Sequence, residues 1–548
     1  MENHESRDAT PDLEKNLVWD DSNGPTRRPS MESLHQEKDD AQSTISHHTL
    51  SSLHAAKTRS ATSSPLSLQR GTTREQDHSN YIPGISSDNP NIVVWDGPDD
   101  PANPRNWPFT RKLLYTIVAG SMVFAVSFSS SVFAPAITST AEIYGVSTYV
   151  TSLAISLHIL GFAAGPCLFG PMSEVFGRTI PMWIGLCGLG IFQIPQALAG
   201  NLRTILVCRF FEGMFGSGVF AVVSGMIIDV WDPIIRGVPL AWSATGINLG
   251  ATVAPVVGGF VVATVGWRWT AWVTGILVLV LAICGIFTIR ESFEPVLLAR
   301  KAKRMRFATQ NWSLHAASEE IPFDAHLLVQ KYLTKPIRMF FQEPILIIIS
   351  TYLTLVYGIL YLAYQAFPFS FERRGWAFDI AYLPFLSLIL GIISAWAVFS
   401  LYTLTAYKKR FLARGGSVPE DRLPPMIFGA AVLPPALWWF AWSTHTHWVS
   451  QVIAGYFIGL GLLLVFICGI VYVVDVYHQH ANSAVSIHVV MRSVVSCSFP
   501  LFATPMFESL GTDWACTLLG FVCLLMVPAP VVFLRYGKDI RKWSRFAE

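Results

Sequence analysis

The chain alternates between apolar stretches of membrane-spanning length and short polar connections. A helix that crosses the hydrocarbon core of a bilayer needs roughly 20 residues, and twelve apolar stretches approach or exceed that length. They lie at 113–136, 150–171, 180–199, 204–230, 240–262, 269–289, 343–365, 376–402, 424–442, 449–474, 483–509 and 513–535. The alternation of apolar and polar residues typical of a membrane β-barrel is absent. The pattern therefore predicts an all-α membrane protein with twelve transmembrane helices.

The polar segments divide these helices into two groups of six, which predicts two six-helix bundles. The first ninety or so residues are rich in Ser, Thr, Asp, Glu and His and contain no apolar run that could form a core, which is typical of disorder. Serines in RRPS (27–30) are either phosphorylation sites or simply solvated. The expected divisions are 1–108 (a disordered cytoplasmic tail and the segment leading into the first helix), 109–290 (first bundle), 291–342 (cytoplasmic central loop), 343–536 (second bundle) and 537–548 (cytoplasmic C-terminal tail).

Lys and Arg are concentrated on the side of the membrane that also holds both chain ends. The connections on the other side contain only Arg203, Arg268, Arg373 and Arg374. This positive-inside bias predicts that both termini are cytoplasmic. The basic, partly amphipathic stretch RESFEPVLLARKAKRMR (290–306) is typical of a helix on the anionic inner leaflet. It lies beside a membrane span and has no nucleic-acid recognition fold, so we expect no nucleic-acid partner.

Composition excludes several other classes of protein. The chain has 548 residues, 52% of them hydrophobic and only 14% charged, against about 25% charged in a soluble domain. All eight cysteines fall within predicted spans without metal-ligand spacing, which indicates buried thiols and no metal or other cofactor. There is no GxxxxGK[ST] motif for an ATP-driven pump. No nucleophile–base constellation is visible either, so we expect no catalytic residues.

The stretch GINLGATVAPVVGGF (246–260) places several helix breakers inside one predicted span. Small residues at intervals of four form a stripe that allows a neighbouring helix to approach closely. Pro255 should bend this helix and leave the carbonyl of Ala251 without its helical hydrogen bond. The stripe consists of Gly246, Gly250, Ala254 and Gly258.

Three motifs in order resemble those of the major facilitator superfamily: GPMSEVFGRTIP (170–181), RFFEGMFGSG (209–218) and the glycine-rich stretch. DGPDDPANPRNWPFTRK (96–112) and YVVDVYHQHANSA (472–484) extend the resemblance to fungal twelve-span drug:proton antiporters, over about 92–537. Glu174 stands where the superfamily usually has Asp. The resemblance implies export of drugs, polyamines or fungal secondary metabolites in exchange for protons, across the plasma membrane or, alternatively, the vacuolar membrane.

The resemblance also implies functional residues at matching positions. An inner gate would comprise Gly170, Glu174, Gly177, Arg178, Asp229 and Arg236, whose charges are expected to form one network. The antiporter signature would comprise Gly246, Gly250, Pro255, Gly258 and Gly259, with Ala254 in place of a further glycine. The resemblance implies that the small-residue stripe faces the eighth helix, in the other bundle.

Ionisable residues inside spans cost at least ~2.5 kcal/mol each at mid-membrane and need partners or water. Arg209 and Glu212 lie three residues apart, on one helix face. They either form an ion pair that locks the bundle or lie beside a central cavity, where Glu212 would exchange protons. His158 and His488 either titrate near neutral pH or are structural. The expected coupling residues are Arg209, Glu212 and His158, whereas Asp475 and Arg492 are expected to hold two helix ends together.

A substrate cavity should lie between the bundles near mid-membrane. Its candidate walls, which could instead be ordinary packing, are Phe133, Asn248, Tyr361, Tyr364, Gln365 and Phe367. Aromatic walls with few charges favour large amphipathic cargo. We therefore expect a monomeric secondary active exporter that interacts with a small-molecule substrate, protons and the lipid bilayer. The alternatives are a polyamine:proton antiporter and a transporter-like nutrient receptor.

Overall fold

The computed structural model describes residues 84, 89–320, 330, 334–416, 418–477, 480–544 and 546. Apart from position 84, residues 1–88 of the predicted disordered tail lie outside the described residues. The disorder of that segment stays a prediction. The first half of the described chain contains α2 (Phe109–Ser131), α3 (Ile137–Tyr144), α4 (Thr148–Val175), α5 (Thr179–Ala197), α6 (Leu202–Val230), α7 (Gly237–Thr264) and α8 (Arg268–Thr288).

The second half contains another set of long apolar helices. They are α12 (Pro344–Glu372), α13 (Phe385–Tyr402), α15 (Pro424–Trp442), α16 (Trp448–Tyr477), α17 (Ala481–Ser496), α18 (Phe499–Met526) and α19 (Pro528–Trp543). Between the halves lie α9 (Glu294–Thr309) and α11 (Lys335–Gln342), and α13 continues through a π-helical turn into α14 (Lys408–Arg414). We call the end of the bundles beside α9 the central-loop end, and the opposite end the far end.

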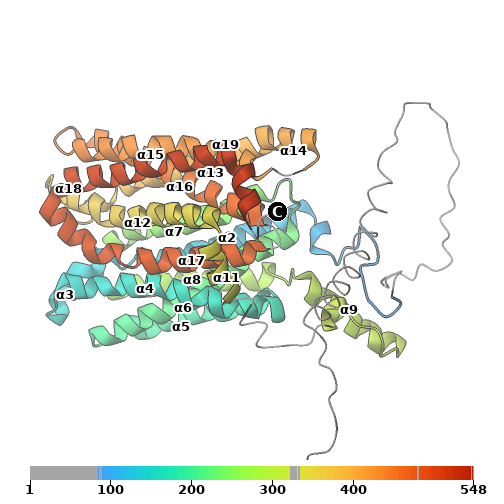
Figure 1. Cartoon of the computed structure of the whole chain (residues 1–548). Coiled ribbons are helices and arrows are strands. Elements are labelled where there is room, and N and C mark those ends of the chain that lie inside the picture. The colour runs from blue at the N-terminus through green and yellow to red at the C-terminus, as the bar shows by residue number, and fades with distance from the viewer. Residues whose placement is uncertain are drawn as a thin grey trace, which may run out of the picture. The chain divides into compact units, whose positions relative to one another are not determined.

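Eleven helical stretches in the described part of the chain are long and apolar enough to cross a membrane, and α17 is a shorter apolar helix. The last stretch, Phe499–Lys542, contains Gly511, whose φ of 72° and ψ of 168° interrupt α18. The chain turns back at this point (Figure 1), so α17 and the first part of α18 make one crossing. The rest of α18 and α19 make the next. The predicted twelve-span all-α architecture is therefore confirmed, with the last break where the sequence places it.

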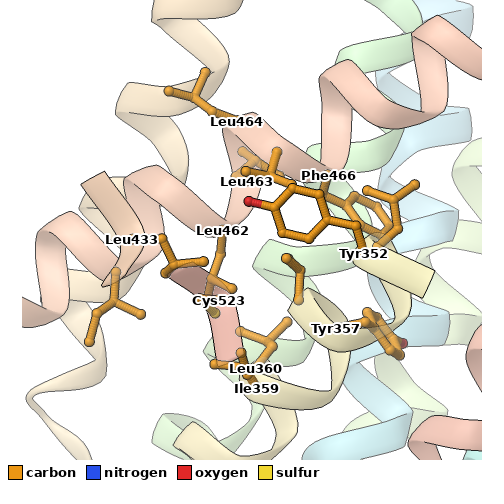
Figure 2. Packing of buried hydrophobic residues seen from close by; sticks show 14 of the residues in the cluster. Tyr352, Tyr357, Ile359, Leu360, Leu433, Leu462, Leu463, Leu464, Phe466 and Cys523 are labelled. Atoms are coloured by element: carbon orange, nitrogen blue, oxygen red, sulfur yellow. The ribbon is translucent and has the colours of Figure 1, made fainter. Parts of the chain in front are cut away.

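The long helices pack as two groups, and the core of the second group extends to residues of α4 and α7. In the first group α6 packs against α4 and α5, and α2 against α7 and α8. In the second group α16 packs against α13 and α15, while α12 contacts α17 and α18. Figure 2 shows the core of the second group, where Tyr352, Leu463 and Phe466 converge. The two groups meet where α4 packs against α17 and where α7 packs against α13.

The small-residue stripe of α7 faces α2, so the expected neighbour, the eighth helix α13, is wrong. A Cβ added to Gly246, Gly250 or Gly258 would lie 2.8, 2.2 or 2.6 Å from the carbonyl oxygen of Gly120, Phe124 or Val132 respectively. Ala254 packs against Phe128 and Val132 of the same α2 region. The stripe is therefore a tight contact within the first bundle. Of the glycines in the antiporter signature, Gly259 faces the second bundle, against the ring of Tyr382.

The carbonyl freed by Pro255 has a partner on α2. Ser131 Oγ donates a hydrogen bond of 2.6 Å to the Ala251 oxygen, and both groups are buried. A buried carbonyl without a hydrogen bond would cost about 1–3 kcal/mol. The proline bend and the close approach of α2 are thus parts of one contact, because only a nearby α2 can supply the missing donor.

The segment leading into α2 packs against α9 and the residues that follow α9. Val93 N donates to the His315 oxygen at 2.9 Å, and Lys301 Nζ on α9 contacts Asp96 at 2.7 Å and Asp100 at 3.5 Å. Val93 is buried against Ala302 of α9. The sequence alone does not predict these contacts, because the partners lie two hundred residues away.

We expect Gly250→Ala to destabilise the first bundle, because its Cβ would collide with the backbone of α2. Overpacking of this kind costs about 1–3 kcal/mol, which should lower the thermal midpoint of the purified protein by several degrees. Gly275→Ala in α8 is the matched control, since its Cβ would lie an ordinary 3.6 Å from Gln193. Equal midpoints for both variants would show that the α2–α7 contact is not tight.

Candidate functional site

A cluster of ionisable and amide groups lies fully buried inside the first bundle. Arg209 Nη1 lies 3.4 Å from Glu212 Oε2, and His158 Nδ1 lies 3.7 Å from the same oxygen. The Gln196 amide, oriented with its nitrogen toward the carboxylate, donates to Glu212 Oε2 at 3.1 Å and accepts from Arg209 Nη2 at 3.1 Å. The three residues predicted for proton coupling, Arg209, Glu212 and His158, are therefore brought together, and Gln196 completes the cluster.

Arg209 ties this cluster to α2. Its Nη1 donates to the Ser129 oxygen at 2.6 Å, and Gln193 Nε2 donates to Ser129 Oγ at 3.1 Å. The guanidinium also lies over the ring of Phe133, 4.8 Å from its centroid. Phe133 is fully buried against Trp267. It is therefore a packing partner of the buried charge and lines neither of the cavities described below, contrary to its predicted place in the substrate wall.

The next serine of α2 crosses to the second bundle. Ser130 Oγ and the Tyr361 hydroxyl are 2.7 Å apart, and the hydroxyls of Tyr361 and Tyr357 are 3.3 Å apart. One turn further along α12, the Tyr364 hydroxyl lies 3.5 Å from Thr252 Oγ1 on α7. Two of the predicted cavity residues, Tyr361 and Tyr364, therefore lie at the boundary between the bundles. Asn248 is buried nearby on α7 and donates to its own helix, to the Ala244 oxygen at 3.0 Å.

A cavity of about 240 Å³ lies between the bundles toward the far end. Gln365 lines it and accepts a hydrogen bond of 3.0 Å from Thr504 Oγ1. Phe367 does not reach it, because its ring stacks between Phe385 and Phe440 at centroid distances of 4.9 and 4.5 Å. The remaining wall combines aromatic rings with two carboxylates: Tyr364, Phe369, Phe378, Tyr382, Phe507, Glu372 and Glu508.

At the central-loop end, part of the predicted gate network is present. Arg178 Nε donates to Asp229 Oδ2 at 3.0 Å. Gly177, with φ of 87°, brings the chain so close to Glu291 that a Cβ there would lie 2.5 Å from its carboxylate. Gly170 and Glu174 line a small cavity of about 70 Å³ together with Arg178.

Arg236 departs from the predicted network. Its Nη2 contacts Asp475 Oδ1 on α16 at 3.5 Å, so it pairs across the bundles and not with Asp229. The same carboxylate accepts from Arg422 Nε at 3.0 Å, and Arg422 lies over the ring of Tyr407 at 3.4 Å. Asp475 is 2% exposed and is shared by a cation from each bundle. This contact joins the two bundles at the central-loop end.

Arg492 is also placed differently from the expectation that it holds a helix end to Asp475. Asp475 and Arg492 do not pair; Arg492 lies in the core over the rings of Tyr357 and Phe466, at 4.1 and 5.5 Å. Both His488 ring nitrogens are buried without a hydrogen bond in the described structure.

Sequence reasoning missed several residues of these sites. The serine run at 129–131, Glu291 and Arg422 were not singled out. The serine run carried a usable signal, because three consecutive hydroxyls inside an apolar span need buried partners. Arg422 carried none, since its partner Asp475 is far away in the sequence.

Comparison with known proteins gives the family. The sequence matches the family model of the Major Facilitator Superfamily over residues 119–500. A citrinin biosynthesis cluster MFS transporter of Monascus ruber is 43% identical over 461 residues, which cover 83% of this chain and 92% of the relative. The chain belongs to the major facilitator superfamily. A multidrug transporter of Candida glabrata is a further member of this superfamily, 37% identical over 472 residues that cover 85% of this chain and 83% of the relative.

The fold agrees with this membership. The solved structure of the proton:xylose symporter XylE, bound to 6-bromo-6-deoxy-D-glucose, matches with a TM-score of 0.58 over 78% of this chain and 96% of that chain, at 16% identity. At that identity the likeness shows the fold alone. As a superfamily member with fungal relatives, the chain is a multi-pass membrane transporter of a small-molecule substrate and not an enzyme.

Glu291 gives the central-loop end a pH-dependent stability. Burial raises the pKa of Glu291, but hydrogen bonds from the Arg178 and Phe293 backbone N–H groups and from the Thr179 hydroxyl outweigh it, so the pKa lies below its ordinary value of 4.5. A carboxyl with a lowered pKa stabilises the fold above its unfolded pKa, and the contribution is lost as the pH falls through its folded pKa.

We therefore expect Glu291→Gln to lower the thermal midpoint at pH 7, by the equivalent of roughly 1–3 kcal/mol for a poorly replaced buried acceptor. The gap between wild type and variant should narrow as the pH falls below about 4.5. Thermal unfolding of both proteins between pH 7 and pH 3.5 measures it, with the exposed Glu142→Gln as control. A gap that stays constant over this range would contradict the assignment.

Proposed function

We propose that this transporter exports amphipathic organic compounds in exchange for protons, by alternating access. The observation that supports proton exchange most directly is the Glu212 carboxylate, fully buried between Arg209, Gln196 and His158. A buried carboxylate with a cation on one side and a histidine on the other can hold either charge state as its surroundings change. The names of the relatives, a citrinin cluster transporter and a multidrug transporter, support export of organic compounds.

Coupling between proton and cargo would run through α2. Arg209 contacts the Ser129 carbonyl, and the adjacent Ser130 contacts Tyr361 at the boundary of the bundles. Protonation of Glu212 would leave Arg209 without its counter-charge and shift it against Ser129. Because Ser130 is the next residue, a shift at Ser129 would change the geometry of the hydrogen bond between Ser130 and Tyr361.

Alternating access would use the two ends in turn. Asp475 joins a cation from each bundle at the central-loop end in this conformation, while the cavity lined by aromatic rings and two carboxylates lies toward the far end. We propose that the central-loop end is cytoplasmic, with both termini on that side, and that the protein acts as a monomer in the plasma membrane. The predicted inner-gate and antiporter-signature residues then take part in closure and in holding the first bundle rigid, respectively.

A second candidate function is polyamine:proton antiport. Glu372 and Glu508 line the far-end cavity together with aromatic rings. Carboxylates and aromatic faces both attract organic cations, so this cavity favours positively charged cargo more than the rest of the pathway does.

We expect Glu212→Gln to abolish transport driven by a pH gradient. An amide cannot take up and release the proton, although it keeps the shape of the site. Efflux of a fluorescent drug from vesicles with an imposed pH gradient measures it, with Glu142→Gln at equal abundance as control. Undiminished pH-driven efflux in the variant would rule out Glu212 as the proton carrier.

We expect Asp475→Asn to open the central-loop end. The variant removes the charge that holds Arg236 and Arg422, and breaking a buried pair costs about 3–5 kcal/mol. A cysteine introduced as Val489→Cys in the small cavity should then react several-fold faster with a membrane-impermeant maleimide, after subtraction of the native cysteine signal. Asp539→Asn, which breaks the exposed pair with Lys542, is the control. Equal labelling rates in both variants would contradict the gate.

A further inference from the structure

Arg492 is a buried cation without a counter-charge in the described part of the chain. Its side chain is 1% exposed, and no described carboxylate lies within 4.0 Å of it. Within the described residues its Nε has no hydrogen-bond partner, and its guanidinium lies over the rings of Tyr357 and Phe466. A charge inside a membrane protein is costly unless it is paired or solvated. Arg209, in the other bundle, shows how this fold satisfies such a charge when no ligand is needed.

Arg492 belongs to a row of unsatisfied polar groups. His488, Arg492 and Ser496 recur every four residues and so share one face of α17. They are 2%, 1% and 0% exposed, and both His488 ring nitrogens and Ser496 Oγ lack partners in the described structure. Arginine offers only donors, and the hydroxyl and imidazole can donate as well. The row therefore lacks an acceptor that carries negative charge.

The row lies next to space between the bundles. Val485 and Val489, on the turns preceding Arg492 along α17, line the cavity at the central-loop end. On α16, Ile470 lines the same cavity, and Phe466 under the guanidinium is one turn away. On the other side, Tyr357 links Arg492 to Tyr361 and Ser130 at the bundle boundary. A ligand that reaches Arg492 is therefore in contact with the proposed transport pathway.

We propose that Arg492, with His488 and Ser496, forms a subsite for the anionic group of the cargo, a carboxylate or phenolate on an aromatic compound. The guanidinium pairs with the anion, and the rings of Tyr357 and Phe466 pack against the aromatic part. This assignment rests on the proposed export function and names its substrate class as organic anions. It disfavours polyamines, which would place positive charge against Arg492.

The test compares two xanthene dyes of similar shape and opposite charge. Full-length protein in nanodiscs is titrated with fluorescein, which carries a carboxylate and a phenolate, and with the cation rhodamine 123, and binding is followed by fluorescence anisotropy. We expect wild type to bind fluorescein more tightly. Arg492→Gln should weaken fluorescein binding at least tenfold and change rhodamine 123 binding less than twofold, while Arg492→Lys should weaken fluorescein binding to an intermediate degree. Arg268→Gln, which also removes a guanidinium packed on a ring, is the control.

Several outcomes would overturn the proposal. In the first, wild type binds rhodamine 123 more tightly than fluorescein, or binds both dyes equally. In the second, Arg492→Gln weakens the binding of both dyes equally. In the third, chloride protects wild type but not the variant from unfolding, and fluorescein does not displace the chloride. The last would assign the site to an inorganic counter-ion. Binding is measured without transport, so the two proposals can fail separately. If Arg492→Gln selectively loses fluorescein binding but wild type shows no proton-driven efflux, only the export function is refuted. Efflux of fluorescein that survives Arg492→Gln would refute only the subsite.

Discussion

Three consecutive serines of α2 hold together the parts on which this transporter depends. The Ser129 carbonyl accepts from the buried Arg209, Ser130 meets Tyr361 of the other bundle, and Ser131 donates to the Ala251 carbonyl that Pro255 leaves free. Each contact satisfies a polar group that would otherwise be costly in the membrane interior. The charge cluster, the bundle boundary and the proline bend are therefore positioned by a single turn of helix.

The glycine stripe of α7 makes this arrangement possible. Because Gly246, Gly250 and Gly258 carry no side chain, the α2 backbone lies directly against α7, close enough for Ser131 to reach Ala251. The stripe is thus a rigid contact inside one bundle. Movement between bundles must occur elsewhere, where α4 meets α17 and α7 meets α13. The bundles are also joined by the hydroxyl pairs that Tyr361 and Tyr364 of α12 make with Ser130 and Thr252, and by the ion pair between Arg236 and Asp475 of α16, which can break and reform.

Much of the fold follows from the sequence because span length and charge asymmetry are local properties. The spacing of apolar residues predicted the twelve crossings and the break near Gly511. The spacing of particular residues predicted that Arg209 and Glu212 share one helix face and that Pro255 frees the Ala251 carbonyl. The neighbour of the glycine stripe did not, because any helix can exploit a smooth surface. Nor did the partner of Arg236, because the sequence places several charges at the same end of the bundles without showing which of them are in contact. Phe133 and Phe367 were predicted to line the cavity because they are aromatic residues near mid-membrane. Only the structure shows that other aromatic rings pack against them.

Two of the buried arginines, Arg209 and Arg492, differ in their partners. Arg209 pairs with Glu212, so the proposed protonation of that carboxylate would leave Arg209 without its counter-charge. Arg492 has no carboxylate partner among the described residues, and we have proposed that it pairs with an anionic group of the cargo. The most direct test of proton-coupled export asks whether cargo movement drives proton movement. Purified protein is placed in sealed liposomes that contain a pH-sensitive dye, with a cargo gradient but no initial pH gradient. The account predicts that cargo moving down its gradient drives protons the opposite way. Cargo movement without any proton movement would contradict it.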